Sequence, residues 1–439
     1  MGIMLNVREK LSGRRWPPNE PARLDASSIA ILSARLLLDL SPMSSNARKY
    51  EDELIRSHLR ILYSVRQDRQ VMVTGSAPEP LVAEAAAQIM HHRIGSNGNE
   101  QPYMDLWNLV ATYIDDGLLA QGTIGELIGR ILSILAMDTA ICALTEQCEL
   151  KYQTPVPVAA YYRALLTDDA WEVLRRSIPA NRTNLSESSA KTTFERAFDG
   201  AFFHFSHYAK ANDATPINDR FTWALWLRGT AILCQLNQEL TNRALPIYFS
   251  KHGMVGPNTM SIALEQDKAG QSVDPVNVGV QSAEILKVFS PGHQLPYIAT
   301  VHCYALTGDK SICMTEPSRY ALRNQGNDQE APHYQIDFQG LDAYRNLTES
   351  LKTDIRRMID SSKNSLFNHH PRAYGLPLVR QMLPLLTGHP AATSWFGGLK
   401  ESQEPLQVVA GPSSKGEENQ ATQGKPAKRR TKKKGRGSR

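Results

Sequence analysis

Four polar residues, far apart in the chain, have side chains that could act together on a phosphodiester. They are Glu126, Asn242, Gln266 and Lys268. Carboxylate and amide oxygens are ligands for Mg²⁺, and a lysine beside the ion can orient water or offset the charge that develops on a phosphate. These residue types therefore fit metal-assisted phosphodiester hydrolysis.

The hydrophobic pattern indicates the elements that would position these residues. A long apolar run predicts a helix over 123–148, which contains Glu126. Shorter apolar runs predict strands, although the first of them also fits a helix. The expected strands cover 230–237, 244–249, 261–268 and 295–306, with a helix over 276–289. The predicted order is helix, strand, strand, strand, helix, strand.

Alternation along the strand over 261–268 decides which of its side chains share a face. Period two places Gln266 and Lys268 on one face, and Glu265 and Asp267 on the other. We expect the first face to join Glu126 in a metal site. The alternative is an ordinary strand whose polar residues lie on its exposed side.

Four stretches of the chain resemble a known group of proteins. They cover 121–130, 228–238, 244–248 and 261–268. They resemble basidiomycete fungal proteins of the Crinkler-like and retrotransposon-hot-spot type, whose C-terminal part is similar to restriction-endonuclease-like, PD-(D/E)XK phosphodiesterases. The resemblance spans roughly 32–399 and implies an α/β (α+β) fold with a restriction-endonuclease-like core and a small mixed sheet.

The resemblance also assigns roles to the four residues. Glu126 matches the glutamate of the family's first helix, and Gln266 with Lys268 matches its Gln/Glu-x-Lys strand. Asn242 falls where the family has a metal-binding aspartate. Because an amide is a neutral and weaker ligand for Mg²⁺ than a carboxylate, the resemblance implies a degenerate site with weakened activity. The P-loop ATPase often found upstream in such proteins has no counterpart, since the sequence contains no GxxxxGK[ST] motif.

Composition sets the broad class of the 439-residue chain. Apolar residues make up 41% and charged residues 21%, which excludes a wholly disordered chain. Counts of 28 Gly, 25 Pro and 5 Cys exclude collagen-like and disulfide-dense classes. We expect a flexible lead-in over 1–26, a helical region over 27–117, a nuclease-like α/β domain over 118–400 with a helical insertion near 150–220, and a disordered basic tail over 401–439.

The basic character of the chain is concentrated at its C-terminal end. The formal net charge is +5, yet residues 425–439 contain nine Lys or Arg and no acid, so the remainder has 40 basic and 44 acidic residues, or −4. The cluster predicted to bind nucleic acid comprises Lys428, Arg429, Arg430, Lys432, Lys433, Lys434 and Arg436. Such a cluster binds phosphates or a nuclear import receptor; the alternative is a solvated tail with no dedicated partner.

Other signals are weaker. The apolar run at 128–144 is interrupted by Arg130 and Asp138, so we expect no membrane span. The N-terminus has no secretory h-region, and the five cysteines have no CxxC spacing, which favours free thiols in a nuclear or cytoplasmic protein.

The sequence thus leaves two functions open. The first is a nuclease-like, nucleic-acid-associated protein in which Glu126, Asn242 and Gln266 hold Mg²⁺ and Lys268 assists the attacking water. The second is a non-catalytic effector or scaffold that binds a nuclear partner. The geometry around position 242 distinguishes them.

Overall fold

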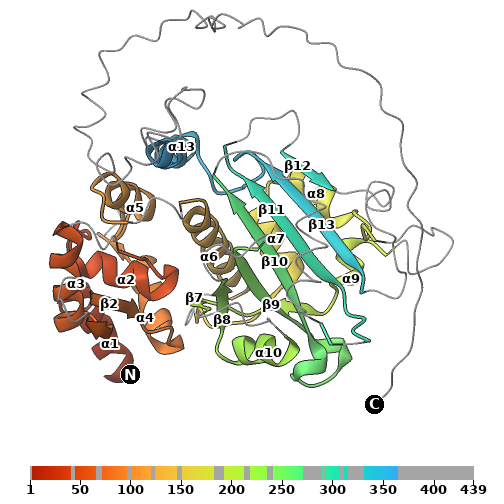
Figure 1. Ribbon diagram of the computed structural model, residues 1–439, viewed down its shortest axis with the longest axis horizontal. Helices are drawn as coiled ribbons and strands as arrows, with labels where there is room; N and C mark the ends of the chain where they lie inside the picture. The colour runs from red at the N-terminus through yellow and green to blue at the C-terminus, as the bar shows by residue number, and fades with distance from the viewer. Residues whose placement is uncertain are drawn as a thin grey trace, which may run out of the picture. The chain divides into compact units, whose positions relative to one another are not determined.

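The computed structural model describes residues 2–363 with interruptions (Figure 1). The interruptions are 41–44, 66–71, 96–100, 120–123, 146–150, 182–191, 212–217, 235–240, 270–288, 291, 306–310 and 315–330. The described residues belong to one unit, Met1–Gln381. The basic tail over 401–439 and nearly all of the helix expected over 276–289 lie outside them.

The N-terminal region consists of helices and two short hairpins. Its helices are α1 (Gly2–Ser12), α2 (Ala26–Leu36), α3 (Ser45–Ser57), α4 (Pro80–Met90) and α5 (Leu106–Asp115). Its hairpins pair β1 (Arg60–Val65) with β2 (Met72–Ser76), and β3 (Arg93–Ile94) with β4 (Gln101–Pro102).

Two expectations for this region are corrected. The lead-in over 1–26 contains helix α1, whose Leu11 is buried in the core. The region over 27–117, which we expect to be helical, also contains strands, since α3 ends at Ser57 and Arg60–Val65 form β1. Leu59 has a φ of 62°, a left-handed conformation that interrupts the helix before the strand begins.

Local sequence signals fix where α2 and α4 begin. The Asp25 side chain accepts a hydrogen bond from the Ser28 amide at 3.1 Å, which caps the first turn of α2. Pro80 opens α4, where its missing N–H costs nothing. These helices begin where their capping residues predict.

A mixed sheet forms the centre of the rest of the chain. Its strands are β5 (Val156–Pro157), β6 (Ala201–Phe203), β7 (His207–Lys210), β8 (Thr230–Leu233), β9 (Arg243–Phe249), β10 (Met260–Lys268), β11 (Tyr297–Cys303), β12 (Ile312–Met314) and β13 (His333–Gln339). The strand order is β12-β13-β11-β10-β9-β6-β5, with β8 also paired to β9 and β7 to β8. The α/β class with a mixed sheet is confirmed.

Strand directions give the sheet two parts. Strands β10, β11 and β13 run parallel to one another, and Glu265 lies beside Thr300 in the register. Strand β9 is antiparallel to both β8 and β10, with Arg243 opposite Glu265. The carboxyl end of β10 therefore lies beside the start of β9.

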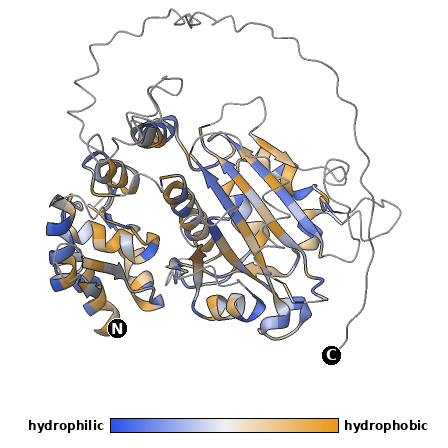
Figure 2. Ribbon diagram, in the orientation of Figure 1, coloured by the Kyte–Doolittle hydropathy of each residue, from blue (hydrophilic) through white to orange (hydrophobic). Residues whose placement is uncertain are grey.

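Helices cover both faces of the sheet. The remaining helices are α6 (Ile124–Leu144), α7 (Val158–Leu165), α8 (Asp168–Arg175), α9 (Phe194–Ala197), α10 (Asp219–Leu227), the short 3₁₀ helices η3 (Ser250–His252) and η4 (Pro257–Thr259), and α13 (Glu349–Lys363). Helix α10 packs Leu225 against Ile262 and Leu264 of β10. Helices α6 and α7 cover the opposite face, and Figure 2 shows hydrophobic and hydrophilic residues alternating along the central strands.

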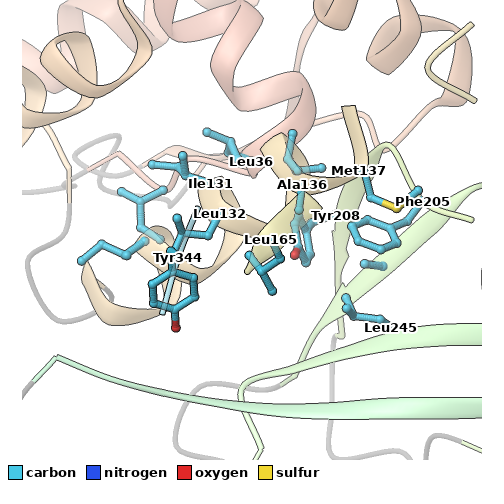
Figure 3. Close-up of a cluster of buried hydrophobic side chains, with 14 of the residues drawn as sticks. Leu36, Ile131, Leu132, Ala136, Met137, Leu165, Phe205, Tyr208, Leu245 and Tyr344 are labelled. Carbon is cyan, nitrogen blue, oxygen red and sulfur yellow. The ribbon is translucent and has the colours of Figure 1, made fainter. Parts of the chain in front are cut away.

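Helix α6 runs through the centre of the hydrophobic core. Figure 3 shows its Ile131, Leu132 and Ala136 among Leu36 of α2 and Leu165 of α7. The helix is long and apolar enough to cross a membrane by length and composition, but most of it is buried within the protein. We therefore assign it as the central helix of the core.

Helix α6 also joins the N-terminal helices to the sheet. Arg35 of α2 forms a buried two-point ion pair with Asp138 of α6, at 2.6 and 2.7 Å, and donates to the Ser206 carbonyl at 2.9 Å. Although burial opposes the charged form, Arg35 lowers the pKa of Asp138 to about 2. Arg130 of α6 donates to the Leu37 carbonyl at 2.8 Å, at the end of α2.

The four cysteines that the structure describes form no disulfide with one another. They are Cys142, Cys234, Cys303 and Cys313, whereas Cys148 lies outside the described residues.

Candidate functional site

The structure brings Glu126 and Asn242 together. Glu126 lies in the first turn of α6, and Asn242 immediately precedes β9. Asn242 Nδ2 donates a hydrogen bond to Glu126 Oε1 at 2.9 Å. Asn242 Oδ1 accepts from the backbone amide of Asp267 at 2.8 Å, so the orientation of the amide is fixed by both partners. Position 242 therefore presents a donor, rather than an oxygen ligand, to Glu126.

The face of β10 that meets α6 carries Glu265 and Asp267. Both carboxylates pair with Arg243 of β9 on this face. A methyl group at Gly129 of α6 would lie 2.2 Å from Asp267 Oδ1, so α6 and β10 are in close contact there. Our expectation that these two acids face away from Glu126 is wrong.

Alternation then places Gln266 and Lys268 on the opposite face from Glu126. Gln266 is buried, so the alternative of a polar residue on an exposed side is also wrong for this position. Its Oε1 has no hydrogen-bond partner in the part of the chain that the structure describes. The four predicted site residues thus divide into one pair that meets and one pair on the other face.

Arg243 is the centre of the arrangement. Its Nε lies 2.6 Å from Asp267 Oδ2, its Nη2 lies 3.0 Å from Asp267 Oδ1, and Nη2 also lies 2.6 Å from Glu265 Oε2. All three side chains are buried. Ion pairs of this kind depend on complete hydrogen bonding because both partners have lost their water.

Neighbouring hydroxyl groups supply further hydrogen bonds. Arg243 Nη1 donates to Ser133 Oγ at 2.7 Å and to Tyr208 Oη at 3.0 Å. Tyr304 Oη donates to Asp267 Oδ1 at 2.7 Å. We call the set of Glu126, Asn242, Arg243, Glu265 and Asp267 the Arg243 cluster.

The Arg243 cluster contains more acids than cations. Although burial opposes the charged guanidinium, the carboxylates of Asp267 and Glu265 raise the pKa of Arg243. Burial raises the pKa of Glu265 to about 7, against the attraction of Arg243. Burial and then the charge of Asp267 raise the pKa of Glu126. Arg243 faces three carboxyl groups, with Arg130 also acting on Glu126, and Glu265 is the member of the cluster that retains its proton up to about pH 7.

Replacing Glu265 with glutamine should remove one source of pH dependence from the free energy of unfolding. A carboxyl with a folded pKa of about 7 holds a proton that the unfolded chain releases from about pH 4.3. Its contribution to stability is therefore complete below about pH 4.3 and is lost as pH rises to about 7. Between pH 4.5 and 7.5, the variant should gain on the order of 2 kcal/mol relative to the parent. Urea unfolding at a series of pH values measures this gain.

A surface variant provides the control for this experiment. Arg175 lowers the pKa of Glu172, so Glu172→Gln should leave the pH profile in this window unchanged. Parallel profiles for the parent and Glu265→Gln would contradict a proton held by the cluster.

The residues of the cluster do not fit Mg²⁺. Arg243 lies between the two carboxylates of β10, and Asn242 Nδ2 donates to the remaining acid, Glu126. A hard cation needs oxygen ligands that are free to turn toward it. Among the described residues, no group of three His, Cys, Asp or Glu side chains is placed to hold an ion. We therefore assign no metal-dependent step to these residues.

Sequence reasoning missed Arg243, although a signal for it exists. Arg243 is the lone cation in the otherwise apolar strand β9, and Glu265 and Asp267 alternate on its neighbour. A buried cation beside two acids of one strand face indicates an internal ion pair. The predicted nucleic-acid-binding residues of the tail lie outside the described residues and stay a prediction.

Comparison with known proteins gives one match. Residues 19–148 match a family described as a domain of unknown function (DUF8736), a segment that begins before α2 and ends after α6. No curated protein and no solved structure has a significant match to the chain. The match includes Glu126 but none of the strands that form the rest of the Arg243 cluster.

Proposed function

We propose that this protein is a nuclease-like, nucleic-acid-associated protein that has a restriction-endonuclease-like core and binds without hydrolysing phosphodiesters. The observation that carries the proposal is Arg243, which pairs with both carboxylates of β10 at the carboxyl end of that strand. A guanidinium fixed there fills the place of a catalytic cation. The protein then acts through binding.

The order of elements supports the fold part of this proposal. Strands β8, β9 and β10 follow one another in the chain, with β9 antiparallel to both β8 and β10, and β11 then runs parallel to β10. Between α6 and β8 the chain forms helices α7 to α10 and also strands β5, β6 and β7, which join the same sheet. Our expectation of a helical insertion near 150–220 is therefore wrong. With β5 to β7 set aside, the order agrees with the helix, strand, strand, strand and final strand expected from the sequence.

The charges of the Arg243 cluster support the relation to a catalytic site. In the family that the sequence resembles, the second strand supplies an acid and the third supplies an acid followed by a lysine. Here the second of these strands supplies Arg243, and β10 supplies Glu265 and Asp267. Lys268 keeps the family's position on β10 but lies on the other face, and Arg243 is the cation that pairs with the acids, so the site forms a closed ion pair.

A cleavage assay tests the absence of hydrolysis. The parent protein, incubated with supercoiled plasmid and Mg²⁺ or Mn²⁺, should leave the plasmid intact. Asn242→Asp restores the acid of the family and is the matched variant for latent activity. Cleavage by the parent that disappears in Glu126→Gln, with unchanged thermal unfolding, would contradict the proposal and favour an active nuclease.

Removing residues 425–439 tests the binding part. The segment has nine basic residues and no acid, whereas the remainder carries a formal charge of −4. Each phosphate neutralised on duplex DNA contributes a slope of about 0.9 to the fall of log affinity with log salt. Truncation should flatten this slope, measured by fluorescence anisotropy, and should abolish nuclear accumulation of a tagged protein. Identical slopes and an unchanged nuclear signal would show that the tail is solvated and has no dedicated partner.

A second candidate function is supported by the β1–β2 hairpin. This hairpin exposes Ile61, Leu62, Tyr63, Val65 and Val73. A group of exposed apolar side chains favours a protein partner over a polyanion. We propose the non-catalytic effector or scaffold as the alternative, to be adopted if the full chain fails to bind nucleic acid at low salt.

A further inference from the structure

A cavity of about 940 Å³ lies among α1, α4 and residues 151–153. Its lining shares no residue with the Arg243 cluster, so it is a separate feature of the molecule. The aromatic part of the lining comprises Trp16, His91, His92 and Tyr152. The size is that of a site for a small organic ligand.

The aromatic part of the lining, which we call the aromatic wall, contains two pairs of rings. His91 stacks on Tyr152 with ring centroids 5.0 Å apart and planes 14° apart. Trp16 lies against His92 at 4.7 Å, and the Arg8 guanidinium is 5.4 Å from the centre of the indole. Rings held by their neighbours in this way can stack a planar ligand with little loss of side-chain freedom.

The polar part of the lining is a chain of hydrogen bonds with two unsatisfied atoms. Arg8 donates to Gln88 Oε1, and Gln88 Nε2 donates to Glu84 Oε1 at 2.7 Å. Glu84 is buried, and burial raises its pKa, while Gln88 and Arg35 oppose the rise. Glu84 Oε2 and Arg8 Nε have no hydrogen-bond partner within the described residues. An acceptor left unpaired in a protein wall gains from a ligand that donates to it.

The charges that line the cavity favour an anion. Arg8, Arg93 and Lys151 contribute three cations, and Glu84 is the one acid among the described lining residues. Lys151 is exposed at the rim. A ligand with a ring for the aromatic wall, an amino group for Glu84 and a negative charge for the rim would match all three features.

We propose that this cavity binds a nucleotide. The base lies along the aromatic wall, its exocyclic amino group donates to Glu84 Oε2, and its phosphate lies near Lys151 and Arg93. Carboxylates accept from exocyclic amino groups of bases in this manner, and bases held outside a duplex are stacked on aromatic side chains. The proposal does not depend on the role of the Arg243 cluster, because the two sites share no residue.

Isothermal titration of the full-length protein tests the proposal with AMP and UMP. AMP should bind with a dissociation constant on the order of 100 µM. UMP should bind about fivefold more weakly because uracil lacks the exocyclic amino group. Lys151→Ala should weaken AMP binding about fivefold, and Glu84→Leu should abolish the preference for AMP over UMP. Glu53→Gln, an exposed change on α3, is the control and should bind like the parent.

A single-stranded adenine oligonucleotide of about ten nucleotides distinguishes a free nucleotide from a base within a strand. Binding of AMP that depends on Lys151 supports a free nucleotide. Binding of the oligonucleotide alone, with the same dependence, supports a base within a strand. No binding of either probe, or binding unchanged by Lys151→Ala, would overturn the proposal. If Glu84→Leu fails to fold, the exposed Lys151 variant and the AMP-to-UMP comparison still decide the question.

Discussion

Arg243→Met is expected to destabilise the protein by about 3–5 kcal/mol. The change removes the cation of a buried pair and leaves Glu265 and Asp267 without the charge that offsets their loss of water. Without Arg243, which opposes the effect of burial, the raised pKa of Glu265 would rise further, so the folded chain would hold this proton to higher pH. Because the unfolded chain releases that proton as pH rises, the loss of stability should be larger at pH 8 than at pH 5.

Unfolding in urea at both pH values measures the effect. Arg176→Met is the control, because Arg176 is 69% exposed and its ion pair with Glu172 lies at the surface, so the loss should stay within about 1 kcal/mol. Arg243→Lys keeps the charge but loses the two-point contact, so we expect an intermediate loss. A loss below about 1 kcal/mol for Arg243→Met would show that the cluster does not hold the sheet together.

Gly129→Ala should destabilise the protein by about 3 kcal/mol, against the usual effect of alanine in a helix. In an ordinary helix interior this replacement stabilises by about 1 kcal/mol. Here the new methyl group would lie 2.2 Å from Asp267 Oδ1 and 2.5 Å from Arg243 Nη2. The helix must move away from β10 or the ion pair must rearrange, and both outcomes expose buried charge.

Two other glycines calibrate this prediction. At Gly125, one turn earlier in α6, the added carbon would lie 3.0 Å from the Ala269 amide, so we expect a smaller loss. At Gly2 nothing lies within 4 Å, and alanine should be neutral. Thermal unfolding of the three variants should therefore rank Gly129 below Gly125 and Gly125 below Gly2. An increase in stability for Gly129→Ala would contradict the close packing of α6 on β10.

The central strands could be predicted from the sequence because their apolar runs are short and bounded by turn residues. Strand β13 was missed, although its sequence, His-Tyr-Gln-Ile-Asp-Phe-Gln, alternates polar and apolar residues as a half-buried strand does. The alternation does not predict that six of its seven positions are buried. Tertiary packing on both faces of the sheet overrode the local pattern, as it often does for strands.

The candidate site was predicted in part. Period two correctly separated Glu265 and Asp267 from Gln266 and Lys268, but it carries no information on which pair faces α6. The choice of face depends on Arg243, which lies on the neighbouring strand β9 and attracts Glu265 and Asp267. Contacts between strands distant in sequence decide the identity of a face, and a single strand cannot reveal them.

The segment that matches the family ends just after α6, but we expect the cooperative folding unit to extend further, because α6 contacts elements on both sides of this boundary. The match ends at residue 148, just beyond α6, but one side of this helix pairs with Arg35 and its other side contacts Arg243. A fragment cut at that boundary would carry away the helix that closes one face of the sheet and would leave Ser133 and Gly129 without their partners. We therefore expect a single unfolding transition for the matched segment and the strands beyond it, because α6 contacts both.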